Sequence, residues 1–285
     1  MSASLAIDGT YSIGDTPYGN RKVFTTRESS FNGSRIRGSF LDGGIDFELT
    51  LSSGAKELEH VNILRSDDNA IIYMRTCGFA QAGANETRFI ADFEAPNSSN
   101  HSWLNSGKYA GIRTVNEMTG SIELAIYDIS NLTPTEPSVT LIDPAGEPNQ
   151  PWDCATTSGQ RGATVFTENV SLGGSLSVGS SKRGSRNIIP ITGGTVSGRF
   201  DGVVVPGGAD YQLIGATTTL DARYLLEDNS GEVVLVRNCG PFGALVPQFE
   251  ARSSGQHAYL NENRYLSSDP GIGGGGVSIT FYEAQ

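Results

Sequence analysis

An internal repeat is the feature of this sequence that most limits its fold. Three segments occur twice in the same order: LDGGIDFEL (41–49) and VPGGADYQL (205–213), IIYMRTCG (71–78) and VVLVRNCG (233–240), and HSWLNSGKY (101–109) and HAYLNENRY (257–265). The offset drifts only from 164 to 156 residues, and it changes where Gly, Ser and Asn are frequent, as loops allow. We therefore expect two copies of one structural unit within the 285 residues.

A proline-rich segment separates the two copies. Five of the twelve prolines lie between residues 134 and 151, and proline favours an extended, semi-rigid backbone. We predict an N-terminal domain at 1–133, a linker at 134–153 and a C-terminal domain at 154–285.

Each copy has the pattern of a β protein. Apolar or alternating runs such as 45–51, 121–129 and 232–238 recur between clusters of Gly, Asp, Asn and Ser that favour hairpin turns. No segment keeps a helical apolar stripe over three turns, which leaves room for one or two short helices at most. We predict an all-β fold of two antiparallel β-barrels, up-and-down and calycin-like, joined as a covalent pseudo-dimer. A sandwich is the alternative.

Composition and motifs exclude several functions. The formal net charge of −11 opposes binding to nucleic acid or to anionic membranes, and no apolar run is long enough for a membrane span. The first residues lack the pattern of a secretory signal, so a cytoplasmic location is expected. Glycine-rich segments precede strands rather than helices, and HxH, HExxH and CxxC spacings are missing. We expect neither a cofactor nor a metal.

The three cysteines are too few and too scattered to indicate a disulfide framework. Cys77 and Cys239 occupy equivalent positions in the repeat and could approach each other across a pseudo-two-fold axis. The alternative, which we favour, is that all three are free and partly buried thiols.

The C-terminal copy resembles the family called domain of unknown function 3237, also known as the UPF0311 group. The resemblance is carried by 190–212, with its Gly-Gly before Asp-Tyr-Gln, by 220–240, with Asp-Ala-Arg-Tyr, and by 249–261, with Tyr-Leu-Asn. The N-terminal copy is similar to a divergent member, since Glu-His-Val-Asn at 59–62 replaces Asp-x-Arg-Tyr. The resemblance implies small β-barrels that commonly pair, in a fungal-type two-copy protein, and it associates the chain with secondary metabolism.

Strand alternation suggests which polar side chains share a face. Asp210 lies on one face with Gln212, Asp221 lies on one face with Arg223, and a strand reading of 257–261 aligns its polar side chains. If these faces line one barrel interior, they form a mixed pocket. We predict as catalytic Asp210, Arg223 and His257, and as substrate-binding Gln212, Arg237, Tyr259 and Asn261, together with Asp46, Arg75, His101 and Trp103 of the first copy. Each of these residues also has a structural interpretation, as a turn cap, a strand-bridging ion pair or a loop tie.

The sequence leaves three functions open. The leading hypothesis is a cofactor-independent isomerase or cyclase that acts on a small hydrophobic, aromatic polyketide- or terpenoid-like metabolite by substrate positioning and proton transfer. The second is a non-catalytic carrier of such a molecule, and the third is a protein-interaction module with filled barrels. We expect the C-terminal copy to hold the working site, because it keeps the Asp-x-Arg-Tyr pattern, and a homo-oligomer is possible.

Overall fold

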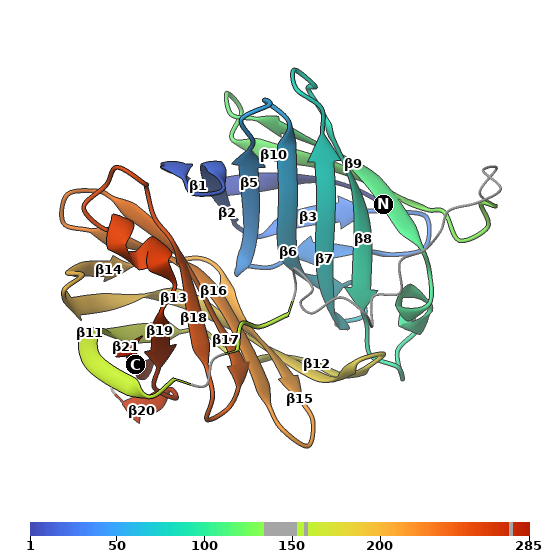
Figure 1. Cartoon of the computed structure of the whole chain (residues 1–285). Coiled ribbons are helices and arrows are strands. Elements are labelled where there is room, and N and C mark those ends of the chain that lie inside the picture. The colour runs from blue at the N-terminus through green and yellow to red at the C-terminus, as the bar shows by residue number, and fades with distance from the viewer. Residues whose placement is uncertain (134–152, 157–158, 274–275) are drawn as a thin grey trace.

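The computed structural model describes residues 1–133, 153–156, 159–273 and 276–285. The protein is all-β, and its two antiparallel sheets each curl into a ring (Figure 1). We call them the N-terminal ring, drawn in blue to green, and the C-terminal ring, drawn in yellow to red. The predicted linker at 134–153 lies outside the described residues, except for Asp153.

The N-terminal ring is a meander closed by its first strand. Its strands are β1 (Ser2–Thr16), β2 (Gly19–Thr26), β3 (Ser29–Asn32), β4 (Arg37–Phe40), β5 (Gly44–Thr50), β6 (Lys56–Ser66), β7 (Ile71–Ala80), β8 (Thr87–Glu94), β9 (Tyr109–Asn116) and β10 (Ser121–Asp128). From β5 to β10 each strand pairs with the next, β1 pairs with β10 and β2, and β2 pairs with β5. This circuit of pairings closes the sheet on itself.

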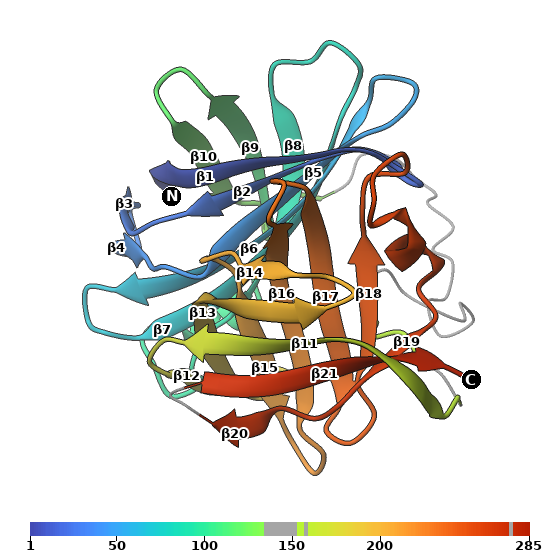
Figure 2. The same ribbon diagram turned by 90° about the vertical axis from the view of Figure 1, so that its left-hand side faces the viewer.

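The C-terminal ring repeats this plan. Its strands are β11 (Arg161–Leu172), β12 (Leu176–Ser181), β13 (Gly184–Gly198), β14 (Gly202–Val204), β15 (Ala209–Ile214), β16 (Thr219–Asp228), β17 (Val233–Pro241), β18 (Val246–Glu250), β19 (Tyr265–Ser267), β20 (Gly271–Gly273) and β21 (Gly276–Ala284). The long strand β13 pairs with β11, β12, β14 and β15. It therefore takes the positions that β2 and β3 together occupy in the N-terminal ring. Figure 2 shows β11 and β21 side by side at one edge of this ring.

Short helices follow β8 and β18 at equivalent points of the two rings. These are the 3₁₀ helices η1 (Ser102–Asn105) and η3 (Ala258–Glu262). Within the described part of the chain, no helix is both long and apolar enough to cross a membrane.

Among the described residues, three apolar clusters form the core, one inside each ring and one between the rings. In β16, Tyr224 and Leu226 belong to the interior cluster of the C-terminal ring, whereas Leu225 belongs to the cluster shared by both rings. Strands at this contact are therefore covered on both faces. That double burial explains why segments such as 232–238 contain nearly continuous apolar runs rather than a clean alternation.

The contact between the rings is built twice, from equivalent residues. Glu250 accepts hydrogen bonds from Thr16 (2.7 Å) and Arg21 (2.9 Å). Glu94 accepts the matching bonds from Ser181 (2.7 Å) and Arg186 (2.7 Å). Such reciprocal pairs are what a two-fold relation between two copies produces.

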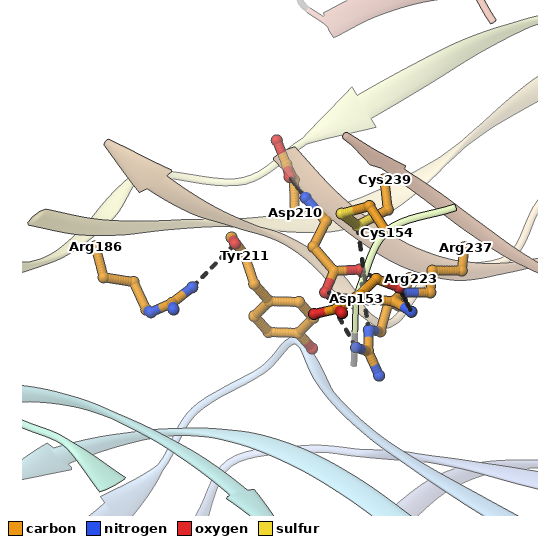
Figure 3. Close-up of a disulfide and its surroundings, with 9 residues drawn as sticks. Asp153, Cys154, Arg186, Asp210, Tyr211, Arg223, Arg237 and Cys239 are labelled. Carbon is orange, nitrogen blue, oxygen red and sulfur yellow. Dashed lines mark hydrogen bonds and ion pairs between the residues drawn. A yellow bond between two sulfur atoms is a disulfide. The ribbon is translucent and has the colours of Figure 1, made fainter. Parts of the chain in front are cut away.

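A disulfide corrects the expectation that all three cysteines are free thiols. Cys154 and Cys239 are bonded, with their Cα atoms 5.2 Å apart, while Cys77 is exposed and free. Cys77 and Cys239 therefore do not pair. The bond holds the chain ahead of β11 against the end of β17 (Figure 3). Spacing along the chain gave no sign of this pairing, because the partners are 85 residues apart and meet only in the folded ring.

Candidate functional site in the C-terminal ring

A cavity of about 80 Å³ lies inside the C-terminal ring. Most of its wall is aliphatic, and four polar side chains reach it. The polar residues are Asp210, Gln212, Tyr224 and Asn238, and the apolar ones include Val170, Leu172, Ile189, Ile191, Leu220, Ala222, Leu245, Val277 and Ile279. A mostly apolar cavity with a few convergent polar groups is the usual form of a small-molecule site.

Asp210 is held firmly in this cavity. One carboxylate oxygen accepts the backbone N–H of Asp221 (3.1 Å), and the other accepts the Gln212 amide (2.8 Å). Burial raises the pKa of Asp210 to about 6, against the lowering effect of these hydrogen bonds. A carboxyl group that titrates near neutrality is suited to accept and return a proton.

A second acid lies behind the cavity wall. The Tyr224 hydroxyl donates to Glu168 Oε1 at 2.5 Å, and Glu168 Oε2 has no hydrogen-bond partner among the described residues. Burial of Glu168 raises its pKa to about 8, although the bond from Tyr224 lowers it. At neutral pH, Glu168 therefore carries a proton. Tyr224 is the diagonal neighbour of Asp210 on the interior face, because Asp210 is opposite Ala222.

Asn238 completes the polar set from the adjacent strand, β17. Its amide oxygen accepts the Ser267 hydroxyl at 3.0 Å. Because that bond uses the oxygen, the NH₂ group is the end of Asn238 that can donate to a molecule in the cavity.

The N-terminal ring has the same strand arrangement, but different side chains occupy its interior. Strand register relates four positions across each sheet. They are Phe24, Asp46, His60 and Thr76 in the N-terminal ring, and Ile189, Asp210, Ala222 and Asn238 in the C-terminal ring. Asp46 and Asp210 are thus equivalent, and larger side chains stand beside Asp46.

Arg113 fills the N-terminal ring at this point. Its guanidinium donates twice to Asp46, at 2.8 Å each, and once to Glu48, at 3.0 Å. His60 lies beside Asp46, and burial lowers the pKa of its imidazole to about 4, so it is neutral at pH 7. Among the described residues, Asp210 has no ion-pair partner of this kind. Of the two equivalent aspartates, Asp210 borders the cavity described above, whereas both oxygens of Asp46 are bound by Arg113.

The predicted arginines lie outside the cavity. Arg223 points away from the ring interior, where it donates to Asp221 and, at 2.6 Å, to Glu59 of the N-terminal ring. Arg237 binds the same Asp221 carboxylate, and Arg75 lies 3.9 Å from Glu59. Figure 3 shows Asp210 and Arg223 on opposite sides of the sheet. The prediction that they share one interior is therefore wrong, although Asp221 and Arg223 do share a strand face, as predicted.

The two histidines predicted as site residues each contact an aspartate beside a turn. His257 contacts Asp228 at 2.7 Å, and His101 contacts Asp68 at the same distance. The strand alignment proposed for 257–261 is wrong, because η3 occupies this segment. Asn261 binds both backbone groups of Ala251, a loop tie that matches the structural interpretation given above. The structure thus separates His257 from Asp210, and Tyr259 packs under Arg199 rather than in the cavity.

Three residues of the candidate site were missed by strand reading: Glu168, Tyr224 and Asn238. For Glu168 a signal existed, because it shares a strand face with Phe166 and Val170, both buried. A carboxylate on an otherwise apolar face marks a position that needs an explanation. Trp103, another predicted residue, borders a separate cavity in the N-terminal ring.

Curated relatives match part of the chain. A UPF0311 protein of Bradyrhizobium diazoefficiens is 41% identical over 78 residues, which is 27% of this chain and 51% of that protein. The chain spans about half the length of the curated relatives it matches.

Two solved structures are also similar. One is a protein with unknown function from Clostridium acetobutylicum, with 24% identity and a TM-score of 0.41 over 45% of this chain and 95% of that one. The other is an enzyme from Penicillium herquei, with 16% identity and a TM-score of 0.34 over 44% of this chain and 88% of that one.

The family comparison covers both rings. The protein-family model described as "Protein of unknown function (DUF3237)" matches residues 1–132 and 162–244 of this chain. Together these segments make up most of the chain, as the resemblance of the sequence implied. The chain belongs to the DUF3237 family.

Proposed function

We propose that the chain is a cofactor-independent enzyme of the isomerase, cyclase or lyase type, with its site in the cavity of the C-terminal ring. In this proposal each ring is a β-barrel and the two form a covalent pseudo-dimer. The observation that carries the proposal is the contrast between Asp210 and its equivalent Asp46. Asp210 borders a cavity and has no ion-pair partner in the described part of the chain, whereas Asp46 is neutralised by Arg113.

Proton abstraction next to a carbonyl is the step this arrangement supports best. Asp210 would take the proton from carbon, and the electron pair would move to the carbonyl oxygen as an enolate. The same carboxyl group would return the proton at a second carbon, which completes an isomerisation without any co-reactant. The raised pKa of Asp210 supports both halves of this step, because the carboxylate and the acid are each accessible near neutral pH.

Tyr224 and Glu168 would stabilise the enolate oxygen. When Glu168 is protonated, their hydrogen bond can run in reverse, with Glu168 donating to the Tyr224 oxygen and the phenol proton turned to the ligand. A carboxylic acid kept neutral by an apolar site is an established way to stabilise such an oxygen. The Asn238 NH₂ group supplies a second donor.

The cavity wall supports the substrate class. Its aliphatic side chains favour a hydrophobic molecule, and its volume of about 80 Å³ suits one ring of an aromatic or terpenoid-like metabolite. The same wall supports a second candidate, a non-catalytic carrier of such a molecule, because a mostly apolar lining binds without requiring chemistry.

The test is deuterium incorporation from D₂O into a panel of enolisable aromatic ketones and terpenoid enones, followed by mass spectrometry. We expect incorporation or rearrangement with the natural protein, and a loss of about 10²–10⁴-fold in Asp210→Asn, which is the usual contribution of a positioned base. Asp201→Asn, an exposed change in the same ring, is the matched control.

Each of the other outcomes contradicts the proposed enzyme activity at Asp210. Saturable binding without exchange or product supports the carrier. Exchange that survives in Asp210→Asn places the chemistry elsewhere. If no compound binds and none undergoes exchange, the result supports rings that are filled by their own side chains.

A further inference from the structure

The N-terminal ring contains a second cavity, of about 100 Å³, in a different part of the fold from the proposed site. It lies between η1, the turn that joins β3 to β4, and the end of β10. Its wall includes the rings of Phe93, Trp103 and Tyr109, with Ile36 and Ile126 beside them.

The arginine contacts beside this cavity have equivalents in the C-terminal ring. The Arg35 guanidinium carbon lies 3.6 Å from the centre of the Trp103 ring, and the Arg199 carbon lies 3.7 Å from the centre of the Tyr259 ring. Each arginine also forms an ion pair with the last strand of its ring. The pairs are Arg35 with Asp128 and Arg199 with Glu283.

Three phenylalanines fill the equivalent space in the C-terminal ring. Ile36 follows Arg35 as Phe200 follows Arg199, and Ile126 precedes Asp128 by two residues as Phe281 precedes Glu283. Ile126 is bonded to Met1 where Phe281 is paired with Phe166. The three phenylalanines pack on one another, with ring centres 4.7 Å apart for Phe166 and Phe281 and 5.9 Å apart for Phe166 and Phe200.

The N-terminal cavity is therefore the space that aromatic rings occupy in the other copy. Its volume of about 100 Å³ is about two thirds of that of dry, apolar protein cavities that take up benzene, which measure about 150 Å³. The space therefore suits a ligand with no more than one six-membered ring inside it.

The polar atoms at its edge restrict the ligand further. The Asp128 carboxylate borders the cavity, 3.3 Å from Arg35, and it can accept a hydrogen bond. A ligand that meets Asp128 therefore needs a donor group, and one that meets Arg35, which borders the same cavity, needs an acceptor. A hydroxyl group satisfies both, because it can donate one hydrogen bond and accept another.

We propose that the cavity bordered by Trp103, Ile36 and Asp128 is a second ligand site, which binds a neutral single-ring phenol or the phenolic end of a larger molecule. The aromatic wall contacts the ring, and the phenol hydroxyl donates to Asp128. This site is independent of the chemistry proposed for the C-terminal ring.

Phenol and toluene are the probes for this site. The readout is the NMR signal of the Trp103 indole N–H, assigned with Trp103→Phe. We expect a saturable shift with phenol and binding at least several-fold weaker with toluene, which lacks the hydroxyl group.

Ile36→Phe should weaken phenol binding at least tenfold, because it restores the residue that fills the C-terminal ring. Ile126→Phe is an independent second variant, and circular dichroism checks the fold of each. Ala222→Val narrows the other cavity and should leave the Trp103 response unchanged. The proposal is overturned if phenol does not shift Trp103, if well-folded Ile36→Phe and Ile126→Phe bind it as the natural protein does, or if Ala222→Val abolishes the shift.

Discussion

Arg113 and Asp46 form a bidentate ion pair inside the N-terminal ring, with both N–O distances at 2.8 Å. Asp210 has the same place in the strand register of the C-terminal ring, and there it borders a cavity. Duplication has thus given one frame two interiors. At this position Arg113 fills one interior, and a cavity lies in the other.

Replacing Arg113 should strongly destabilise the N-terminal ring. Arg113→Met leaves the buried Asp46 carboxylate without its guanidinium partner and leaves Glu48 with Lys56 alone. Such a loss at a buried carboxylate typically costs about 3–5 kcal/mol. Urea unfolding followed by tryptophan fluorescence measures this change. Adding Asp46→Asn and Glu48→Gln to Arg113→Met should recover much of the stability. If the single variant unfolds at the same urea concentration as the natural protein, the ion pair does not stabilise the ring.

Strand alternation predicted which side chains share a face, but not which face is interior. Asp210 and Gln212 do lie together, opposite Tyr211, as predicted. Both faces of β15 are covered, however, one by the ring interior and one by the other ring. Burial therefore could not distinguish the faces, and Arg223 was assigned to the interior when it belongs to the contact between rings.

Other differences have local causes. The segment of His257 and Asn261 forms one 3₁₀ turn, which is too short to leave a periodic pattern. The role of Glu168 depends on Tyr224, which reaches it from a distant strand. A repeat is readable from residues alone, whereas contacts between strands far apart in sequence require the fold.

Glu168 should make stability fall as the pH rises. Its folded pKa of about 8 lies above the usual 4.5, so the unfolded chain releases this proton first. The stabilising effect of the bound proton is complete below pH 4.5 and is lost as the pH rises through 8, at about 1.4 kcal/mol per pH unit. Glu168→Gln should match the natural protein at pH 4.5 and be more stable by a few kcal/mol at pH 8. Denaturant unfolding at both pH values measures this, and parallel pH profiles would contradict it.

Reduction of the disulfide should lower the stability of the C-terminal ring. The bond joins residues 85 apart, and closing a loop of this size stabilises a fold by up to about 4 kcal/mol. We expect Cys154→Ser to lower the melting temperature and to make it insensitive to a reducing agent. Cys77→Ser, at the free and exposed cysteine, is the control and should melt like the natural protein. Disulfides persist mainly in oxidising compartments, and the cytoplasmic location expected from the sequence stays a prediction.

The reciprocal contacts predict matched effects from two distant carboxylates. Glu94 and Glu250 are both buried, and each accepts from an arginine and a hydroxyl of the other ring. Glu94→Gln and Glu250→Gln should each cost about 2–4 kcal/mol, because each leaves a guanidinium of the other ring without its charge partner. The cost should be somewhat larger at Glu94, which also accepts from Arg183.

Glu283→Gln is the control for these two variants. It removes an exposed ion pair with Arg199, which contributes at most about 1 kcal/mol. Urea unfolding of all three variants compares them directly. If Glu94→Gln and Glu250→Gln are as mild as Glu283→Gln, the buried ion pairs are not what holds the rings together, and the shared apolar cluster must do so. If only one of them is severe, the two halves of the contact have diverged in strength although their geometry remains equivalent.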